Sequence, residues 1–370
     1  MARLPAALAG HGWRTLLLAE GHAYPYLLQR GAKPDMVNHS ITASEILDQL
    51  KPRLVAVGTS ENPDTFGFKL VQAAHALGIK TLGVIDAFGN ADYRFRGQTD
   101  NPLAYVPEWL AVPDQWTQEA YISLGYHPDH VTVCGHPHYD YVLDIRARLE
   151  RENMRKLRRK MFPANKKDAP VVVFVSEIST GLNPGKYNRT PDYTLQGRGK
   201  LTGRTEIVLE EFLDALAVLE SRPYLVLRMH PKNTREELAS FLRGFDYVSE
   251  KEDPLGLVYA SDLVVGMTTM LLMEAAIMGK TTLSIVPRSD EKRSLPTLMA
   301  GITPCVTTRE ELRAVLPVLL ERCSRKEADN KKKGFIQYGS LQKTVAFIED
   351  LLTRNSSSIM NKKNGRISNH

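Results

Sequence analysis

The hydrophobic residues of this chain gather in short continuous runs that are separated by longer amphipathic segments. Apolar runs without polar alternation are typical of parallel strands covered on both faces, and the segments between them are typical of helices. The runs form two series, before and after a charged stretch at residues 140–168. They predict strands at Leu16–Ala19, Leu54–Gly58, Thr81–Ile85 and Val131–Cys134, and then at Val171–Ser176, Leu225–Met229, Leu263–Val265 and Thr281–Val286.

Two series of this kind predict an α/β protein of two Rossmann-like, doubly wound domains, because 370 residues exceed one typical core. We predict an N-terminal domain at 1–145, a basic linker at 146–168, a C-terminal domain at 169–340, a helix at 341–354 and a disordered tail at 355–370. Ala2–Gly10 is predicted to be helical and precedes the first predicted strand. The N-terminal domain is therefore expected to lack the strand that usually begins such a fold.

Composition and charge indicate which partners the protein binds and exclude some classes of protein. The chain is 43% hydrophobic and 24% charged, with a formal net charge of +6, which favours anionic partners. Eight of its cations lie in Arg151–Lys167, which predicts either a solvated helix face or a surface that docks on an anionic membrane. No apolar run is long enough to span a bilayer, and nothing resembles a nucleic-acid-binding module.

The cysteines indicate the compartment. Cys134, Cys305 and Cys323 are far apart and form no CxxC pair, which makes a disulfide framework or a zinc site a poor fit. We therefore predict a cytoplasmic protein without a metal site, with peripheral contact at the inner face of the cell membrane as an option.

Candidate chemistry follows the strands of the second series, since ligands of open α/β sheets bind beyond the carboxyl ends of strands. Thr268 and Thr269 stand at the entry to a predicted helix, where free backbone N–H groups suit a phosphate, and Glu274 one turn further in suits ribose hydroxyls. Alternatively, Thr268 caps the helix and Glu274 makes a structural ion pair. After the preceding strand, His230 and Lys232 suit a diphosphate.

A long polar segment, Ile178–Arg204, follows Ser176 and Glu177 at the end of the strand that opens the second series. Basic residues among glycines predict a mobile flap over phosphates, although a disordered insertion would have the same composition. The basic residues are Lys186, Arg189, Arg198, Lys200 and Arg204.

In the first series, Asp86 directly follows a predicted strand and is followed by Arg94 and Arg96. This pattern suits a general base beside groups that bind an acceptor anion. The alternative is that Asp86 caps the next segment.

These residues together resemble a known group of enzymes. Val226–Pro287, with VLRMHPKN and YASDLVVGMTTMLLMEAAIMGKTTLSIVP, resembles the donor half of GT-B glycosyltransferases of bacterial surface-polysaccharide synthesis. It is also similar to CDP-glycerol glycerophosphotransferases and, more distantly, to non-hydrolysing UDP-N-acetylglucosamine 2-epimerases. Gly135–Asp140 resembles the Gly-x-Pro-x-x-Asp segment that joins the two halves. Ser176-Glu177 stands where the epimerases carry a His-Arg-rich motif, which argues against an epimerase.

The resemblance implies two domains that face each other across a cleft, and transfer of a sugar from a nucleotide-activated donor to a surface-glycan or lipid-linked acceptor, without a cofactor. Other options are glycerophosphotransfer from a CDP-alditol, sugar-nucleotide epimerisation or hydrolysis, and nucleotide binding without catalysis. The implied catalytic residues are Asp86 and His230. The implied acceptor-binding residues are Arg94, Arg96, His136 and His138, and the implied donor-binding residues are Ser176, Glu177, Arg204, His230, Lys232, Thr268, Thr269 and Glu274.

Overall fold

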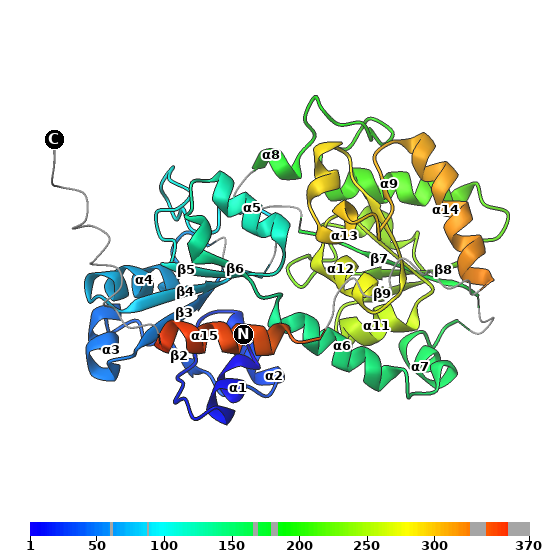
Figure 1. Ribbon diagram of the computed structural model, residues 1–370. Coiled ribbons are helices and arrows are strands. Elements are labelled where there is room, and N and C mark those ends of the chain that lie inside the picture. The colour runs from blue at the N-terminus through cyan, green and yellow to red at the C-terminus, as the bar shows by residue number, and fades with distance from the viewer. Residues whose placement is uncertain (60–61, 87–88, 166–168, 179–183, 326–337, 354–370) are drawn as a thin grey trace. The chain divides into compact units, whose positions relative to one another are not determined.

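The computed structural model describes residues 1–59, 62–86, 89–165, 169–178, 184–325 and 338–353 (Figure 1). The chain divides into two compact units. The first comprises Met1–Asp140 and the C-terminal part of the chain from Gly339, and the second comprises Tyr141–Tyr338. The predicted disordered tail at 355–370 lies outside the described residues.

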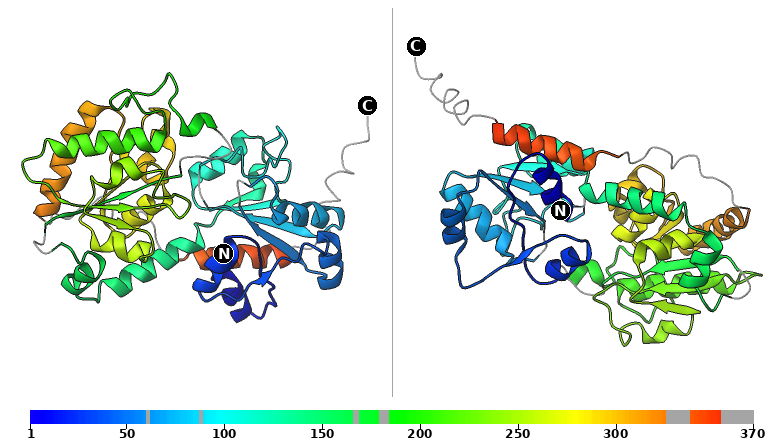
Figure 2. Two further views of the ribbon diagram at one scale, coloured as in Figure 1. Left: turned by 180° about the vertical axis from the view of Figure 1, so that it is seen from behind. Right: turned by 90° about the horizontal axis from the view of Figure 1, so that it is seen from below.

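The first unit is built on a parallel sheet with strand order β3-β4-β5-β6. One face packs against α1 (Leu4–Gly10) and α15 (Ser340–Thr353), and α5 (Gln115–Ser123) lies on the other face (Figures 1 and 2). Tyr121 of α5 is part of the hydrophobic core on that second face. A separate two-stranded parallel sheet pairs β1 with β2. The strands are β1 (Leu18–Ala19), β2 (Asp35–Met36), β3 (Leu54–Gly58), β4 (Lys80–Val84), β5 (Trp109–Val112) and β6 (Val131–Val133), and the remaining helices are α2 (Ala23–Gln29), α3 (Ala43–Leu50), α4 (Phe66–Ala76) and the 3-10 turn η1 (Pro128–His130).

Asp140 attaches the C-terminal helix to this unit. Its buried carboxylate accepts hydrogen bonds from the backbone N–H groups of Gly339, Ser340 and Leu341, at 3.1, 3.3 and 2.8 Å. Gly135 adopts φ +75°, and a Cβ there would lie 2.2 Å from Ser340 Oγ, so the close approach requires glycine. The helix predicted at 341–354 therefore belongs to the first unit, although it follows the whole second unit in sequence.

The second unit has a six-stranded parallel sheet with the order β12-β11-β10-β7-β8-β9. α9 (Arg204–Ala217) and α14 (Arg309–Ser324) cover one face, whereas α11 (Pro254–Ala260) and α12 (Met270–Ile277) lie on the other (Figure 1). The strands are β7 (Val171–Val175), β8 (Tyr224–Arg228), β9 (Tyr247–Ser249), β10 (Leu263–Gly266), β11 (Thr281–Ile285) and β12 (Cys305–Val306), and the short helices are α8 (Pro184–Tyr187), α10 (Ala239–Leu242), η2 (Asp290–Arg293) and α13 (Pro296–Met299).

The basic stretch predicted as a linker is largely helical. α6 (Pro137–Leu149) crosses the boundary between the units, and α7 (Met154–Met161) packs against α11. Arg158 of α7 donates to the carbonyl of Ala260 at 2.9 Å and pairs with Asp262. Residues 154–161 are thus an integral part of the second unit.

The predicted fold class is confirmed, since the structure contains two Rossmann-like parallel sheets flanked by helices. The chain leaves β7 toward β8 and β9 on one side and returns to β10 on the other, so the strand order reverses between β7 and β10. Such switch points are where open α/β sheets bind ligands. None of the helices among the described residues combines the length and the apolar character needed to cross a membrane.

Candidate functional site

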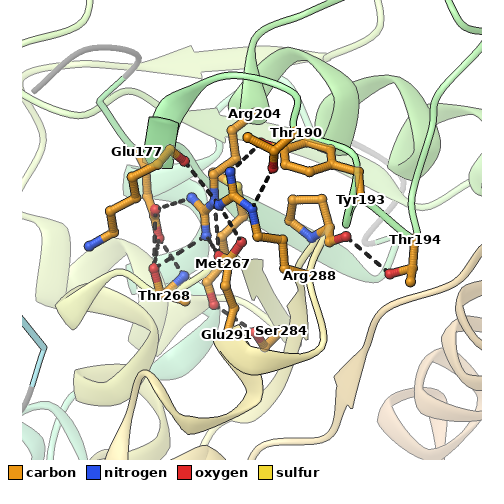
Figure 3. A network of polar contacts seen from close by, with 12 residues as sticks. Glu177, Thr190, Tyr193, Thr194, Arg204, Met267, Thr268, Ser284, Arg288 and Glu291 are labelled. Carbon is orange, nitrogen blue, oxygen red and sulfur yellow. Dashed lines mark hydrogen bonds and ion pairs between the residues drawn. The ribbon is translucent and has the colours of Figure 1, made fainter. Parts of the chain in front are cut away.

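The switch point of the second unit brings Glu177, which follows β7, onto Thr268, which follows β10 (Figure 3). The backbone N–H of Thr268 donates to Glu177 Oε1, and its hydroxyl donates to both carboxylate oxygens at 3.2 and 3.3 Å. Arg204 Nη1 donates to Glu177 Oε2 at 2.6 Å. Three predicted donor-binding residues therefore meet at the switch point, which is where open α/β sheets bind ligands in general.

Arg204 is buried between two carboxylates. Its side chain is only 2% exposed, and it contacts Glu291 through Nε at 2.9 Å as well as through Nη2. Burial lowers the pKa of the guanidinium, but Glu177 and Glu291 outweigh this and raise the pKa overall. Arg204 therefore does not belong to a mobile flap, because its side chain is buried and joins Glu177 to Glu291 inside the second unit.

The rest of the basic segment is also held by internal contacts. Buried Arg288 donates to the carbonyls of Gly185, Lys186 and Asn188, at 2.6, 3.2 and 3.1 Å. Its guanidinium lies over the Tyr193 ring at 4.5 Å (Figure 3). Arg189 donates to the carbonyl of Gln196, and Arg198 pairs with Asp214, whereas Lys200 is exposed. The described part of this segment, 184–203, is therefore fixed against the second unit, and residues 179–183 of the predicted flap lie outside the described residues.

Ser176 links the end of β7 to the end of β8. Its buried hydroxyl accepts from the backbone N–H of His230 at 2.9 Å and lies 2.9 Å from Asn233 Oδ1. The His230 Nδ1 accepts from the backbone N–H of Lys232 at 3.2 Å, which leaves Nε2 as the protonated nitrogen of the neutral ring. Burial, followed by the charge of Lys232, lowers the pKa of His230, so the neutral form prevails at neutral pH.

The start of α12 offers two backbone donors. Thr269 is the N-cap residue, and its hydroxyl accepts from the N–H of Leu271 at 3.3 Å. Within the described part of the chain, the N–H groups of Thr269 and Met270 have no hydrogen-bond acceptor. Thr269, not Thr268, is therefore the cap, and two first-turn donors remain for an anion. Glu274 is half-buried in the same helix, and its ribose role stays a prediction.

The first unit gathers a second group of predicted residues at the carboxyl edge of its sheet. Asp86 follows β4, and its Oδ1 accepts from Arg94 Nη1 and from the hydroxyl of Thr59, which follows β3. Arg94 is buried, whereas the Asp86 side chain is 52% exposed. Arg94 therefore orients a carboxylate that solvent can reach. We predicted that Arg94 binds an acceptor anion, whereas in the structure it binds Asp86.

The remaining predicted acceptor residues differ in their surroundings. His136, which follows β6, is buried, and burial is the main reason that its pKa falls to about 3. Its Nδ1 accepts from the backbone N–H of His138 at 3.2 Å. Arg96 lies over the Tyr93 ring at 4.6 Å and donates to the carbonyl of Thr99 at 3.0 Å, so these contacts hold it within its own loop.

Three residues of these two sites were not predicted from the sequence. Thr59 directly follows a correctly predicted strand, so the strand-end rule would have found it. Glu291 and Arg288 follow no recognisable motif. Glu291 binds Arg204, which lies more than eighty positions earlier in the sequence, and Arg288 binds Glu291. Within the described residues, no cluster of three His, Cys, Asp or Glu side chains is arranged to hold a metal ion.

No protein-family model and no curated protein matches this sequence. The UDP-GlcNAc 2-epimerase from Neisseria meningitidis, solved bound to UDP-GlcNAc, shares 15% identity with a TM-score of 0.64, over 96% of either chain. The epimerase from Methanocaldococcus jannaschii shares 14% identity with a TM-score of 0.64, over 94% of this chain and 95% of that one. The MurG structure from Acinetobacter baumannii shares 16% identity with a TM-score of 0.53, over 94% of this chain and 96% of that one.

These similarities define the class of fold. The chain has a GT-B-type fold with two Rossmann-like sheets, and this fold is related to that of the UDP-GlcNAc 2-epimerases and of MurG. At identities below 20%, they establish the fold alone.

Proposed function

We propose that this protein is a nucleotide-sugar-dependent enzyme whose second unit binds the donor nucleotide at the switch point of its sheet. The observation that carries the proposal is the convergence there of Thr268, the two open N–H groups at the start of α12, and His230. Phosphates bind well at helix N-termini because backbone donors and the helix dipole act together.

The solved structures of this fold support a nucleotide sugar in particular. The Neisseria epimerase was solved with UDP-GlcNAc, and a Staphylococcus aureus protein of the same fold, MnaA, was solved with UDP. The test is a thermal-shift titration of this protein with CMP, CDP, UDP, GDP, ADP and TDP. One nucleotide should raise the melting temperature of the wild type and fail to do so in Glu274→Ala. A flat response to all six would contradict the proposal.

We propose sugar transfer to a hydroxyl acceptor as the reaction. Asp86 is the general base in this scheme, because it is a solvent-accessible carboxylate at a strand end that Arg94 and Thr59 hold in place. Removing a general base typically slows a reaction by about 100- to 10,000-fold. Asp86→Asn should therefore lose at least about 100-fold in kcat, measured as acceptor-dependent release of the nucleotide. The exposed Asp48→Asn is the control and should keep its turnover. Near-normal turnover of Asp86→Asn would exclude this role.

Epimerisation of a sugar nucleotide is the second candidate. It is favoured by the comparison itself, since the two epimerases fit this chain with a TM-score of 0.64, against 0.53 for MurG. An epimerase needs no acceptor, so incubation with UDP-GlcNAc alone distinguishes the two candidates. A new C2 epimer in the NMR spectrum would establish epimerisation. A donor that stays unchanged without an acceptor and is consumed when an acceptor is added would establish transfer.

We also propose that α7 docks on an anionic membrane, where a lipid-linked acceptor would reside. Leu157 and Met161 face the protein interior, and four exposed cations share the opposite side of the helix. Each such cation contributes about 1 kcal/mol near an anionic surface. The four residues are Arg155, Lys156, Arg159 and Lys160.

Sedimentation with vesicles that contain phosphatidylserine tests this surface. Changing all four α7 cations to Gln should abolish binding, while the same change at four other exposed cations should preserve it. Equal binding by both variants would contradict the assignment. The control positions are Arg243, Lys251, Lys292 and Arg293.

A further inference from the structure

Glu177 is an unusual neighbour for a phosphate site. Its carboxylate already accepts the backbone N–H of Thr268, immediately before the two open donors of α12 (Figure 3). Its side chain is only 14% exposed. A phosphate at the same N–H would have to approach a like charge, which is unfavourable at short range.

The surrounding contacts keep Glu177 in this position. Arg204 binds it, Glu291 binds Arg204, and Arg288 binds Glu291 at 3.2 Å (Figure 3). The four side chains carry two positive and two negative charges, so the group is neutral and has no surplus cation for a phosphate. Because Arg204 and Arg288 are buried and make further contacts, moving Glu177 away would leave a buried cation short of a partner.

We infer that Glu177 accepts a hydroxyl of the donor's sugar, while the phosphates take the N–H groups of Thr269 and Met270. This inference rests on the proposed function. A hydroxyl is a donor, and its hydrogen bond to a carboxylate is stronger than one to a neutral acceptor. Three donor protons reach the Glu177 carboxylate, from the N–H and the hydroxyl of Thr268 and from Arg204 Nη1. A carboxylate offers about four acceptor positions, so one more donor can be accommodated.

The arrangement makes Glu177 a specificity residue. It favours a nucleotide that carries a sugar and disfavours the bare nucleoside diphosphate, whose terminal phosphate has the greater charge. Removing the negative charge should therefore weaken binding of the nucleotide sugar without weakening that of the bare nucleotide, whereas loss of a merely structural contact would weaken both.

The experiment measures the Kd of UDP and of UDP-GlcNAc, or of the corresponding pair for the base identified by the nucleotide panel, by calorimetry with the full chain. Glu177→Gln preserves the shape of the side chain, and the exposed Glu220→Gln is the matched control. For Glu177→Gln we expect UDP-GlcNAc to bind about tenfold more weakly, which corresponds to about 1.4 kcal/mol, with UDP unchanged or tighter. Glu220→Gln should match the wild type for both ligands.

Equal weakening of both ligands, or no change in either, would overturn the role of Glu177 and leave the proposed function standing. Binding of neither ligand, nor of any other nucleotide, by the wild type would overturn the proposed function and this inference with it. A second measurement needs no variant. Among nucleotide sugars that each lack one sugar hydroxyl, at least one should bind the wild type about tenfold more weakly, and uniform affinity across the series would also refute the inference.

Discussion

Asp140 gives the sharpest prediction about the stability of the first unit. Its single carboxylate accepts three backbone N–H groups at the start of α15, with N···O distances of 2.8 to 3.3 Å, and the side chain is buried. Asp140→Ala leaves these donors without a partner. A capping residue alone is worth up to about 2 kcal/mol, and a hydrogen bond to a charged group about 1.5–3 kcal/mol. Since water can reach the half-buried N–H of Gly339, we expect a loss of about 3 kcal/mol.

The chain supplies its own probe for this measurement. All three tryptophans, Trp13, Trp109 and Trp116, lie in the first unit. Trp13 Nε1 donates to Glu349 of α15 at 3.1 Å, and the Trp109 ring lies 6.4 Å from that of Phe347 in the same helix. Tryptophan fluorescence during urea unfolding therefore reports the first unit and the attachment of α15.

The expected order of unfolding free energies is wild type, then Asp140→Asn lower by about 1–2 kcal/mol, then Asp140→Ala. Asn keeps one oxygen in place but loses the charge. The exposed Asp48→Asn should match the wild type. A change below about 0.5 kcal/mol for Asp140→Ala would show that solvent replaces the cap and that Asp140 does not hold α15 in place.

Two further predictions concern buried charge. The pKa of His136 falls to about 3, mainly through burial. As the pH falls below about 6.5, His136 becomes protonated in the unfolded chain but stays neutral in the folded chain. The free energy of unfolding therefore decreases as the pH falls from about 6.5 toward 3. Between pH 7 and pH 5 the wild type should lose about 2 kcal/mol more unfolding free energy than His136→Asn, and parallel urea curves would contradict this. Arg204→Met leaves Glu177 without a cation and Glu291 with Arg288 alone, and it should cost about 3–5 kcal/mol by calorimetry. Adding Glu177→Gln and Glu291→Gln should recover much of that loss, and an Arg204→Met melting curve equal to that of the wild type would rule out the bracing role.

The longer strands of the second unit could be predicted because each is a short, continuous apolar run in the sequence. Val171–Val175 is a continuous apolar, mostly β-branched run, and such runs form strands wherever both faces are covered. β5 (Trp109–Val112) was not predicted, because Pro107 and Pro113 flank it closely and proline is typical of turns and loops. β2, β9 and β12 have only two or three residues each and depend on their neighbours in the sheet.

Those residues of the candidate site that directly follow a strand could be predicted from the sequence. Thr268 and Glu177 each follow a predicted strand, and parallel strands bring their carboxyl ends to one edge. The same rule does not predict which residues, far apart in sequence, form hydrogen bonds or ion pairs. It made Arg204 a flap residue because only the tertiary fold supplies Glu291, and it could not show that Asp140 meets Leu341 across two hundred positions.

Met270 allows a direct test of whether the start of α12 binds the donor's phosphates. Met270 is the first residue of the helix, where proline is well tolerated, and Thr269 before it has the extended conformation that proline requires (φ −71°, ψ 145°). Met270→Pro therefore removes one phosphate-binding N–H with little change to the fold, and Met270→Ala is its matched control.

The measurement is a thermal-shift titration of the wild type and both variants with the same nucleotides. We predict that one nucleotide stabilises the wild type and Met270→Ala alike, and that its Kd for Met270→Pro is about tenfold higher, as expected for one lost hydrogen bond to a charged group. Equal affinity in Met270→Pro and Met270→Ala would show that the phosphates do not bind at the start of α12.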